Sequence, residues 1–339
     1  MSGIAQALQR LAEPADLDPA LAQAAFADLM DGAASDPQIA GFLMGLRARG
    51  ETPEILAAGA EVLRARMTPV RAPALCVDTC GTGGDAKGTF NISTAAAIVA
   101  AGAGARVAKH GNRSVSSKSG SSDVLAALGV NLDMGPERAA RAIAQAGVGF
   151  LYAPAHHSAV ARVAQARKAL GVRTVFNLLG PLANPAGAKR QLLGVWSEAW
   201  LEPMAQALQH LGAERAWVVH GRDGLDEITN TAVTEGVELK DGKITPFTLA
   251  PEDVELERAE PDALTGGDAA ANAEAIEALL QGAPGAFRDV TVMNAGACLV
   301  LADRAKDLAD AVRLAELAID NGSARRALDQ LIRISHDAL

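Results

Sequence analysis

The sequence is poor in aromatic residues and in basic charge. It contains 7 Phe, 3 Trp and 1 Tyr among 339 residues, and its formal net charge at pH 7 is -9. Proteins that bind nucleic acid usually combine a basic surface with aromatic side chains on which bases stack. The composition therefore argues against a nucleic-acid-binding protein, and any cluster of cations must be local.

Cysteines and long apolar runs are scarce as well. Cys76, Cys80 and Cys298 form an odd and sparse set, which suits a reducing compartment better than a disulfide-stabilised secreted protein. No stretch approaches the roughly 18 uncharged apolar residues of a membrane span. The N-terminus also lacks the apolar run of a signal peptide. We therefore expect a cytoplasmic protein without a membrane partner.

The first part of the chain predicts a small all-helical domain. Apolar residues recur at helical spacing from residue 1 to about 70, and the breaks between the runs have capping residues. Asp18, Asp36 and Thr52 each precede a proline, which is tolerated in the first turn of a helix. We place this domain at residues 1–72, to which about 165–190 could add a helical contribution.

From residue 73 to residue 339 the pattern is that of an α/β domain with a mostly parallel central sheet. Short apolar runs alternate with Ala-rich segments of helical length. Strands are predicted at 75–79, 105–109, 147–152, 191–195, 216–220 and 289–293. Helices are predicted near 93–102, 122–128, 136–146, 158–170, 199–211 and 272–281, and again from 305. Residues 232–248 predict a hairpin around Asp241-Gly242.

The loop after the first predicted strand is rich in glycine. Residues 80–94 read CGTGGDAKGTFNIST, and the segment from Asn91 to Thr94 opens a predicted helix. Glycine lets backbone N–H groups approach an anion closely, and a helix N-terminus attracts negative charge. The side chains of Asn91 to Thr94 could cap this helix. A phosphate site is one interpretation, and an ordinary glycine-rich turn is the other.

Two better-known nucleotide motifs do not fit this loop. In a dinucleotide-binding loop the helix opens directly after the glycines and the next strand ends near an acidic residue. Here four residues separate Ala86 from Asn91-Ile92-Ser93, and the second strand ends in Lys109-His110-Gly111. The Gly-Lys-Ser/Thr ending of a P-loop is absent from the sequence as well.

The loop after the second predicted strand carries only positive charge. Residues 109–123 include Lys109, Arg113 and Lys118 among serines and glycines, and no carboxylate precedes Asp123. Such a segment in an acidic chain is a local anion-binding site. Because the first two strands are parallel and joined by one helix, both loops should emerge on the same edge of the sheet. Two adjacent phosphate sites favour a ligand with phosphates at both ends.

A third loop on that edge is acidic. Asp223, Asp226 and Glu227 follow the strand that ends near His220. Clustered carboxylates repel one another unless a cation neutralises them, and hard divalent ions with phosphate ligands prefer such oxygens. Beside two phosphate loops, this segment predicts Mg²⁺ that bridges to a pyrophosphate, although a solvated acidic loop is the alternative.

Five segments in order and spacing make the sequence similar to a known family. The glycine loop GTGGD, the segment FNIST, the string KHGNRSVSSKSGSSDVL, the block NLLGPLANP and the acidic loop GLDEIT resemble those of the anthranilate phosphoribosyltransferases over nearly the whole chain. The family usually continues GTGGD with glycine, where this chain has Ala86. The resemblance implies a homodimeric enzyme of tryptophan biosynthesis, with a helical domain and an α/β domain similar to that of pyrimidine nucleoside phosphorylases.

The resemblance also implies residue roles. The substrates would be anthranilate and phosphoribosyl pyrophosphate (PRPP), with Mg²⁺ as cofactor. Lys109, Asp226 and Glu227 are the expected catalytic residues, Ser93, Asp226 and Glu227 the expected metal-binding residues, and Gly81, Asn112 and Arg167 the expected contacts to anthranilate. The expected PRPP-binding residues are Gly81, Gly84, Asp85, Thr89, Asn91, Ile92, Ser93, Thr94, Lys109, His110, Gly111, Asn112, Arg113, Ser114, Val115, Ser116, Ser117 and Ser121.

The chemistry of such a transfer does not require a strong base. The aromatic amine of anthranilate is already neutral near pH 7, and stabilisation of the departing pyrophosphate should dominate catalysis. His110 is the tempting candidate for a base, with a structural or substrate-contacting role as the alternative. His156 and His157 follow the third predicted strand and are candidates for the lining of the acceptor pocket. A pyrimidine nucleoside phosphorylase and a non-enzymatic nucleic-acid-binding relative of the same fold are the competing functions.

Overall fold

Four helices begin the chain, as the periodicity predicts. The computed structural model describes residues 1–83, 87–113 and 119–338. The helices are α1 (Gly3–Ala12), α2 (Pro19–Asp31), α3 (Asp36–Arg49) and α4 (Pro53–Arg66). Asp18 caps α2 by accepting from the N–H groups of Ala20 and Leu21, and Thr52 caps α4. Ser35, one residue before Asp36, is the N-cap of α3.

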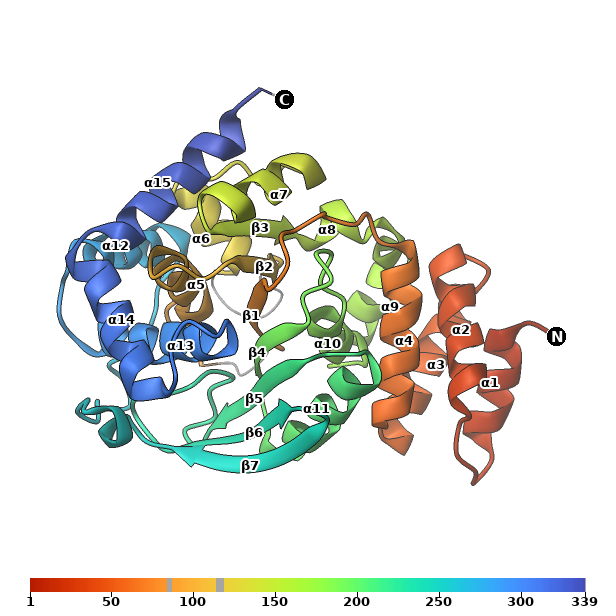
Figure 1. The fold of residues 1–339 in the computed structure, drawn as a ribbon. Helices are drawn as coiled ribbons and strands as arrows, with labels where there is room; N and C mark the ends of the chain where they lie inside the picture. The colour runs from red at the N-terminus through yellow and green to blue at the C-terminus, as the bar shows by residue number, and fades with distance from the viewer. Residues whose placement is uncertain (84–86, 114–118, 339) are drawn as a thin grey trace.

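The four helices share a core with segments from the middle of the chain. Phe26 of α2 meets Phe42 of α3 and Phe176 edge to face, with ring centroids 5.2 and 6.3 Å apart. The later segments are α8 (Ala153–His156), α9 (Ala161–Leu170), α10 (Phe176–Leu179) and the short 3₁₀ helices at Ser158–Val160 and Gly180–Leu182. Figure 1 shows α9 near the N-terminal helices, and α9 packs on α2 and α3. The domain boundary at 72/73 remains a prediction.

A seven-stranded sheet forms the centre of the larger part of the molecule. Its strand order is β3-β2-β1-β4-β5-β6-β7, and the first five strands are parallel. The strands are β1 (Val77–Gly81), β2 (Val107–Gly111), β3 (Val148–Tyr152), β4 (Arg190–Gly194), β5 (Arg215–Gly221), β6 (Thr234–Lys240) and β7 (Lys243–Leu249). The predicted hairpin is confirmed, since β6 and β7 are antiparallel around Asp241 and Gly242, both with positive φ.

One predicted strand is wrong. Residues 289–293 lie inside helix α13 (Ala286–Leu301), in which every residue from Val290 to Leu301 is buried. A helix that is surrounded by protein carries apolar side chains on all sides, so its sequence lacks helical periodicity. The β-branched residues of DVTVM then favour a strand locally, and the packing of the whole helix overrides that preference.

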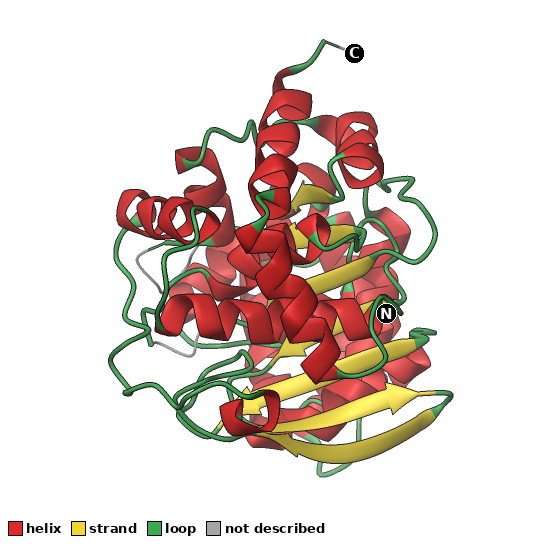
Figure 2. Cartoon of the chain, turned by 60° about the vertical axis from the view of Figure 1, so that its left-hand side comes forward, coloured by secondary structure: helices red, strands yellow, loops and turns green. Residues whose placement is uncertain are grey.

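Helices cover both faces of the sheet (Figure 2). Successive residues of one strand serve opposite cores: Leu192 packs with α5 (Ile92–Gly102) and α13, whereas Leu193 packs with α11 (Leu201–His210) and the N-terminal helices. The remaining helices are α6 (Ser121–Ala127), α7 (Gly135–Gln145), α12 (Ala269–Leu280), α14 (Leu308–Asp320), α15 (Ser323–His336), and the 3₁₀ helices Glu198–Trp200 and Pro251–Val254. None of the described helices is both long and apolar enough to cross a membrane.

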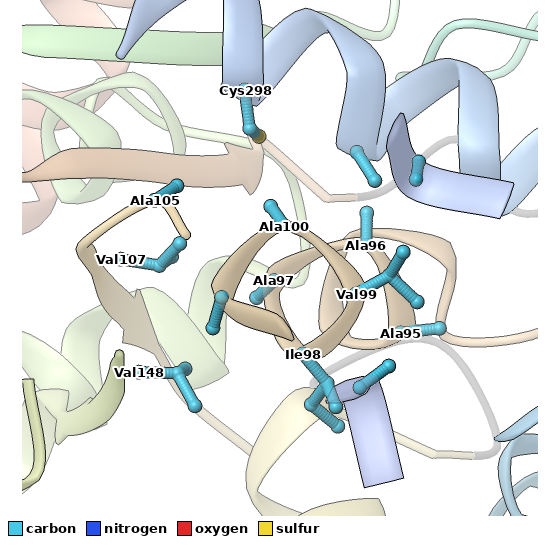
Figure 3. Close-up of a cluster of buried hydrophobic side chains, with 14 of the residues drawn as sticks. Ala95, Ala96, Ala97, Ile98, Val99, Ala100, Ala105, Val107, Val148 and Cys298 are labelled. Carbon is cyan, nitrogen blue, oxygen red and sulfur yellow. The ribbon is translucent and has the colours of Figure 1, made fainter. Parts of the chain in front are cut away.

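Helix α5 lies in the middle of the larger core. Figure 3 shows its side chains from Ala95 to Ala100, four of which are alanines, pointing outward all round the helix, with Val107, Val148 and Cys298 nearby. Small residues allow neighbouring backbones to approach closely: a Cβ on Gly102 would lie 2.5 Å from the backbone of Ala324 in α15. The start of this tightly held helix therefore has a fixed position at the carboxyl edge of the sheet.

Candidate functional site

The loops at the carboxyl edge of the sheet enclose one cavity of about 350 Å³. All the predicted site residues that the structure describes line this cavity: Gly81, Thr89, Asn91, Ile92, Ser93, Thr94, Lys109, His110, Gly111, Asn112, Arg113, Ser121, Arg167, Asp226 and Glu227. Gly84, Asp85, Ser114, Val115, Ser116 and Ser117 lie outside the described residues. The expected convergence of the glycine, basic and acidic loops is confirmed.

Lys109 joins the ends of the first two strands to the first turn of α5. Its side chain is only 3% exposed, and its Nζ donates to the carbonyl oxygen of Thr79 at 2.8 Å and to Ser93 Oγ at 3.0 Å. A buried ammonium needs such acceptors because it has lost its water. The ammonium therefore has a fixed position on the cavity wall, where it can attract an anion.

The three carboxylates of the acidic loop have different partners. Asp226 Oδ2 accepts from the N–H of Gly83 at 2.7 Å, and Glu227 Oε1 accepts from the N–H of Ser93 at 3.2 Å. Asp223 instead faces its own loop, where it accepts from the N–H of Leu225 and from the hydroxyls of Thr229 and Thr231. Two of the three carboxylates predicted to lie together thus face the cavity, and the third stabilises the loop.

The expected capping of α5 by Asn91 is wrong. Asn91 is the N-cap residue, but its side chain makes no capping hydrogen bond and donates instead to the carbonyl oxygen of Ser119. The N–H of Ser93, which we expected to face an anion directly, is held by Glu227. A carboxylate is a stronger acceptor than an amide at a positively polarised helix end, so it takes this place.

Two glycines allow the acidic loop to approach the sheet. A Cβ on Gly81 would lie 2.4 Å from Asp226 Oδ2, and one on Gly194 would lie 1.6 Å from the Asp226 carbonyl oxygen. We did not identify Gly194 from the sequence. Its signal was its place at the end of a buried strand, where a glycine often marks close approach of another backbone.

Asp78 is a second residue that the sequence analysis missed. It is fully buried in β1, and its Oδ1 accepts from the N–H of His110 at 3.1 Å. Burial raises the pKa of this carboxyl to about 6, although hydrogen bonds from Asn184 and His110 oppose the rise. Asn184 also donates to the carbonyl oxygen of Ala108 at 2.8 Å. The block NLLGPLANP is thereby connected to the strand end that carries Lys109.

Three histidines gather behind the cavity. Burial lowers the pKa of His110 to about 3 and that of His157 to about 4, and their ring centroids are 5.1 Å apart. His156 Nδ1 lies 2.8 Å from the carbonyl oxygen of Thr68. Only His110 of the three lines the cavity. Since His110 and His157 are neutral near pH 7, neither adds a positive charge to the site.

Arg167 lines the same cavity as the acidic pair. It projects from α9, its guanidinium carbon is 5.3 Å from the centroid of the Phe176 ring, and burial lowers its pKa. No ion pair joins it to a carboxylate among the described residues. A half-buried guanidinium on an aromatic face is a good site for a planar carboxylate.

The site offers oxygen ligands but no complete metal cage. Within the described ranges no group of three or more His, Cys, Asp or Glu side chains could hold a metal ion. Asp226 and Glu227, with the hydroxyl of Ser93 close to Glu227, supply carboxylate and hydroxyl oxygens of the kind that hard cations prefer. Such a set fits an ion whose other ligands come from a phosphorylated substrate and water.

The buried histidines should make the fold sensitive to acid. His110 and His157 bind fewer protons in the folded protein than in the unfolded chain, where the pKa of histidine is near about 6.5. The contribution of these two neutral histidines to the free energy of unfolding is therefore fully present above about pH 6.5. It is lost as the pH falls toward about 4. The raised pKa of Asp78 has the opposite effect on the free energy of unfolding as the pH falls. Because only this one carboxyl opposes two histidines, we expect the effect of the histidines to be the larger.

His157→Asn should reduce this sensitivity. Asparagine can still donate to the carbonyl oxygen of Ala183, which His157 contacts, but it takes no proton. We expect the decrease in melting temperature between about pH 7.5 and about pH 5 to be smaller in H157N than in the original protein, by a few degrees. Differential scanning calorimetry measures both. An equal decrease in the two proteins would contradict the assignment.

Comparisons with known proteins agree with this arrangement. Residues 5–67 match the model of the glycosyl transferase family, helical bundle domain, and residues 74–325 match that of its a/b domain. The anthranilate phosphoribosyltransferase of Azorhizobium caulinodans is 55% identical over 91% of this chain and 90% of its own length. That of Maricaulis maris is 57% identical over 94% of each chain.

Solved structures give the same result. The crystal structure of anthranilate phosphoribosyltransferase from Thermus thermophilus superimposes with a TM-score of 0.93 and 42% identity, over 99% of this chain and 100% of that one. The Saccharomyces cerevisiae enzyme in complex with PRPP and Mg superimposes with a TM-score of 0.89 and 27% identity, over 98% and 97% of the two chains. The chain therefore belongs to the glycosyl transferase family with an N-terminal helical bundle and, within it, to the anthranilate phosphoribosyltransferases.

Proposed function

We propose that this protein transfers the 5-phosphoribosyl group of PRPP to the amine of anthranilate and releases pyrophosphate, a step of tryptophan biosynthesis. One observation carries the proposal: a single cavity is lined by a buried lysine, two carboxylates and a half-buried arginine that lies on an aromatic ring. The lysine and the carboxylates suit a pyrophosphate with a divalent cation, and the arginine suits a small planar carboxylate.

The donor side would use the glycine and basic loops. We propose that Gly81, Thr89 and the first turn of α5, from Asn91 to Thr94, contact PRPP together with Lys109 and the segment from His110 to Arg113. Ser121 would add a hydroxyl from the start of α6, close to Gly111. Backbone N–H groups, a lysine and an arginine are the donors that bind phosphate oxygens in proteins.

The oxygen ligands of the site fit Mg²⁺. We propose that Asp226, Glu227 and Ser93 hold it, because Mg²⁺ usually takes only one or two protein carboxylates and completes its shell with substrate phosphates and water. When bound, the ion neutralises negative charge that builds on the departing pyrophosphate. Lys109 would do the same from the protein side, since its ammonium is fixed at 3.0 Å from Ser93 Oγ.

The acidic pair would change partners when substrate binds. Asp226 and Glu227 accept from the N–H groups of Gly83 and Ser93, two donors on the wall of the proposed pyrophosphate site. An incoming phosphate would compete with these carboxylates for the same donors. We propose that the carboxylates turn toward the cation and leave the N–H groups to the phosphate, so that cation and PRPP bind together.

The acceptor side would use Arg167, Asn112 and Gly81. The guanidinium of Arg167 would bind the anthranilate carboxylate and so direct the amine toward the ribose. The amine of anthranilate is neutral near pH 7 and needs no prior deprotonation. His110 is neutral and lines the cavity, so it can position the acceptor without adding charge. We assign no general base.

Two competing functions are less well supported. A pyrimidine nucleoside phosphorylase would use free phosphate and would not need the acidic pair that faces this cavity. A nucleic-acid-binding relative would need a basic surface, whereas the net charge of this chain is -9. The relatives and the solved structures described above are anthranilate phosphoribosyltransferases.

Assembly and location also belong to the proposal. The family resemblance implies a homodimer, and a cytoplasmic location agrees with the absence of disulfides among Cys76, Cys80 and Cys298, which are free and buried. We propose both, together with binding of small-molecule substrates only.

The assay that tests the function is direct. Purified protein, anthranilate, PRPP and Mg²⁺ should give a steady loss of anthranilate fluorescence, and the loss should stop when the metal is chelated and resume when Mg²⁺ is added. A pyrimidine nucleoside with free phosphate serves as the competing substrate pair. Turnover of that pair, with none of anthranilate, would refute the proposed function.

Arg167→Ala should weaken anthranilate binding selectively. Loss of a charge-assisted contact to a carboxylate costs about 2 kcal/mol, so the KM for anthranilate should rise about thirtyfold while that for PRPP changes little. Lys168→Ala is the matched control, because Lys168 is an exposed cation on the same helix. Steady-state kinetics separates the two constants. An equal rise in both KM values would reject the proposed role of Arg167.

Two variants of Glu227 test the exchange of partners. Both Glu227→Gln and Glu227→Ala remove the charge, but only glutamine keeps an oxygen that can accept from the N–H of Ser93. With the metal chelated, we expect E227A to bind pyrophosphate about threefold or more tightly than E227Q, because one donor no longer has to be released. Isothermal titration calorimetry measures both affinities. Equal affinities would mean that only the charge matters.

A further inference from the structure

A segment far from the glycine loop in sequence supports its second half. Thr89 pairs with Thr265 in an isolated β-bridge, and the N–H of Gly266 donates to the carbonyl oxygen of Gly88 at 2.9 Å. The approach is close, since a Cβ on Gly266 would lie 2.5 Å from the backbone of Thr89. Helix α12, which packs on α6 (Figure 1), begins directly after this segment.

Asn272 in the first turns of α12 is buried between this segment and the head of α5. It is 1% exposed, its Oδ1 accepts from the N–H of Gly267 at 2.7 Å, and its Nδ2 donates to Asn91 Oδ1 at 2.8 Å. The N–H of Gly267 can only donate, so the oxygen of the Asn272 amide must face it. The NH₂ group must then face Asn91.

The orientation of the Asn272 amide determines that of the Asn91 amide. Because Asn272 presents a donor, Asn91 must turn its oxygen toward α12, and its own NH₂ group points to the carbonyl oxygen of Ser119 at 3.3 Å. The Ser119 hydroxyl donates back to Asn91 Oδ1 at 3.4 Å. Asn91 thus links the head of α5 to the end of the basic loop, and both line the cavity.

We propose that Asn272, which does not line the cavity, is a positioning residue for PRPP binding: it fixes the amide of Asn91 and thereby the spacing between the head of α5 and Ser119. The inference rests on the proposed function, since it concerns the donor side of the same site. It assigns a task to α12, a helix that none of the family motifs in the sequence covers.

Asn272→Asp tests this with almost no change of shape. Aspartate can still accept from the N–H of Gly267, but it places an acceptor opposite Asn91 Oδ1, so the Asn91 amide must turn over or move away. We expect the KM for PRPP to rise about tenfold, with the KM for anthranilate and kcat changed by less than about twofold. Calorimetric titration of Mg²⁺ and pyrophosphate should show a matching loss of affinity.

Asp268→Ala is the control for helix stability. Asp268 caps α12 by accepting from the N–H of Ala271, and it makes no hydrogen bond to Asn91. D268A should lower the melting temperature and leave the KM for PRPP unchanged. If D268A reproduces the rise, or if N272D raises both KM values equally, the effect is one of stability and the proposal is wrong.

Two further outcomes are distinguishable. If the original protein is active and the N272D variant has an unchanged KM for PRPP, this inference is refuted and the proposed function stands. An original protein that does not turn over anthranilate and PRPP refutes the proposed function itself. If N272D does not fold, Asn272→Ala carries the same test, because it also removes the donor that orients Asn91.

Discussion

The buried ammonium of Lys109 is the interaction on which the site depends. Its hydrogen bonds to Thr79 and Ser93 join the ends of β1 and β2 to the first turn of α5. The glycine loop and the basic loop follow β1 and β2, and the acidic loop after β5 joins them through the hydrogen bonds of Asp226 and Glu227. Within the part of the chain that the structure describes, the ammonium contacts no carboxylate, since it donates to a carbonyl oxygen and a hydroxyl. Its charge therefore remains effective toward an anionic ligand.

Several donors of the site have acceptors within the protein itself. Asp226 and Glu227 accept from backbone N–H groups on the cavity wall, and Asn91 is held between α12 and Ser119. Buried donors without acceptors are costly, so these internal hydrogen bonds stabilise the segments around the cavity. In the proposed binding the ligand would replace hydrogen bonds that the protein already makes.

The sequence was sufficient for the strands, the loops and most of the lining residues, because glycine, serine and charge were concentrated at strand ends. It failed where packing decides. The run at 289–293 favours a strand by itself, yet it belongs to a helix that is buried all round. Asp78 and Asn272 have no local motif, since their partners are 32 and 181 residues away. Gly194 matters only because the acidic loop folds back over it.

The shared core of the N-terminal helices has a consequence for biosynthesis. Phe26 packs against Phe176, and the core that begins at Ile4 takes in α9, α10 and α11 and reaches Leu239. A nascent chain therefore exposes apolar surface on its first four helices until roughly 100 to 170 further residues have left the ribosome. At a synthesis rate of about 5–20 residues per second, that interval lasts several seconds or more. Apolar surface of this kind is prone to aggregation until the later segments cover it.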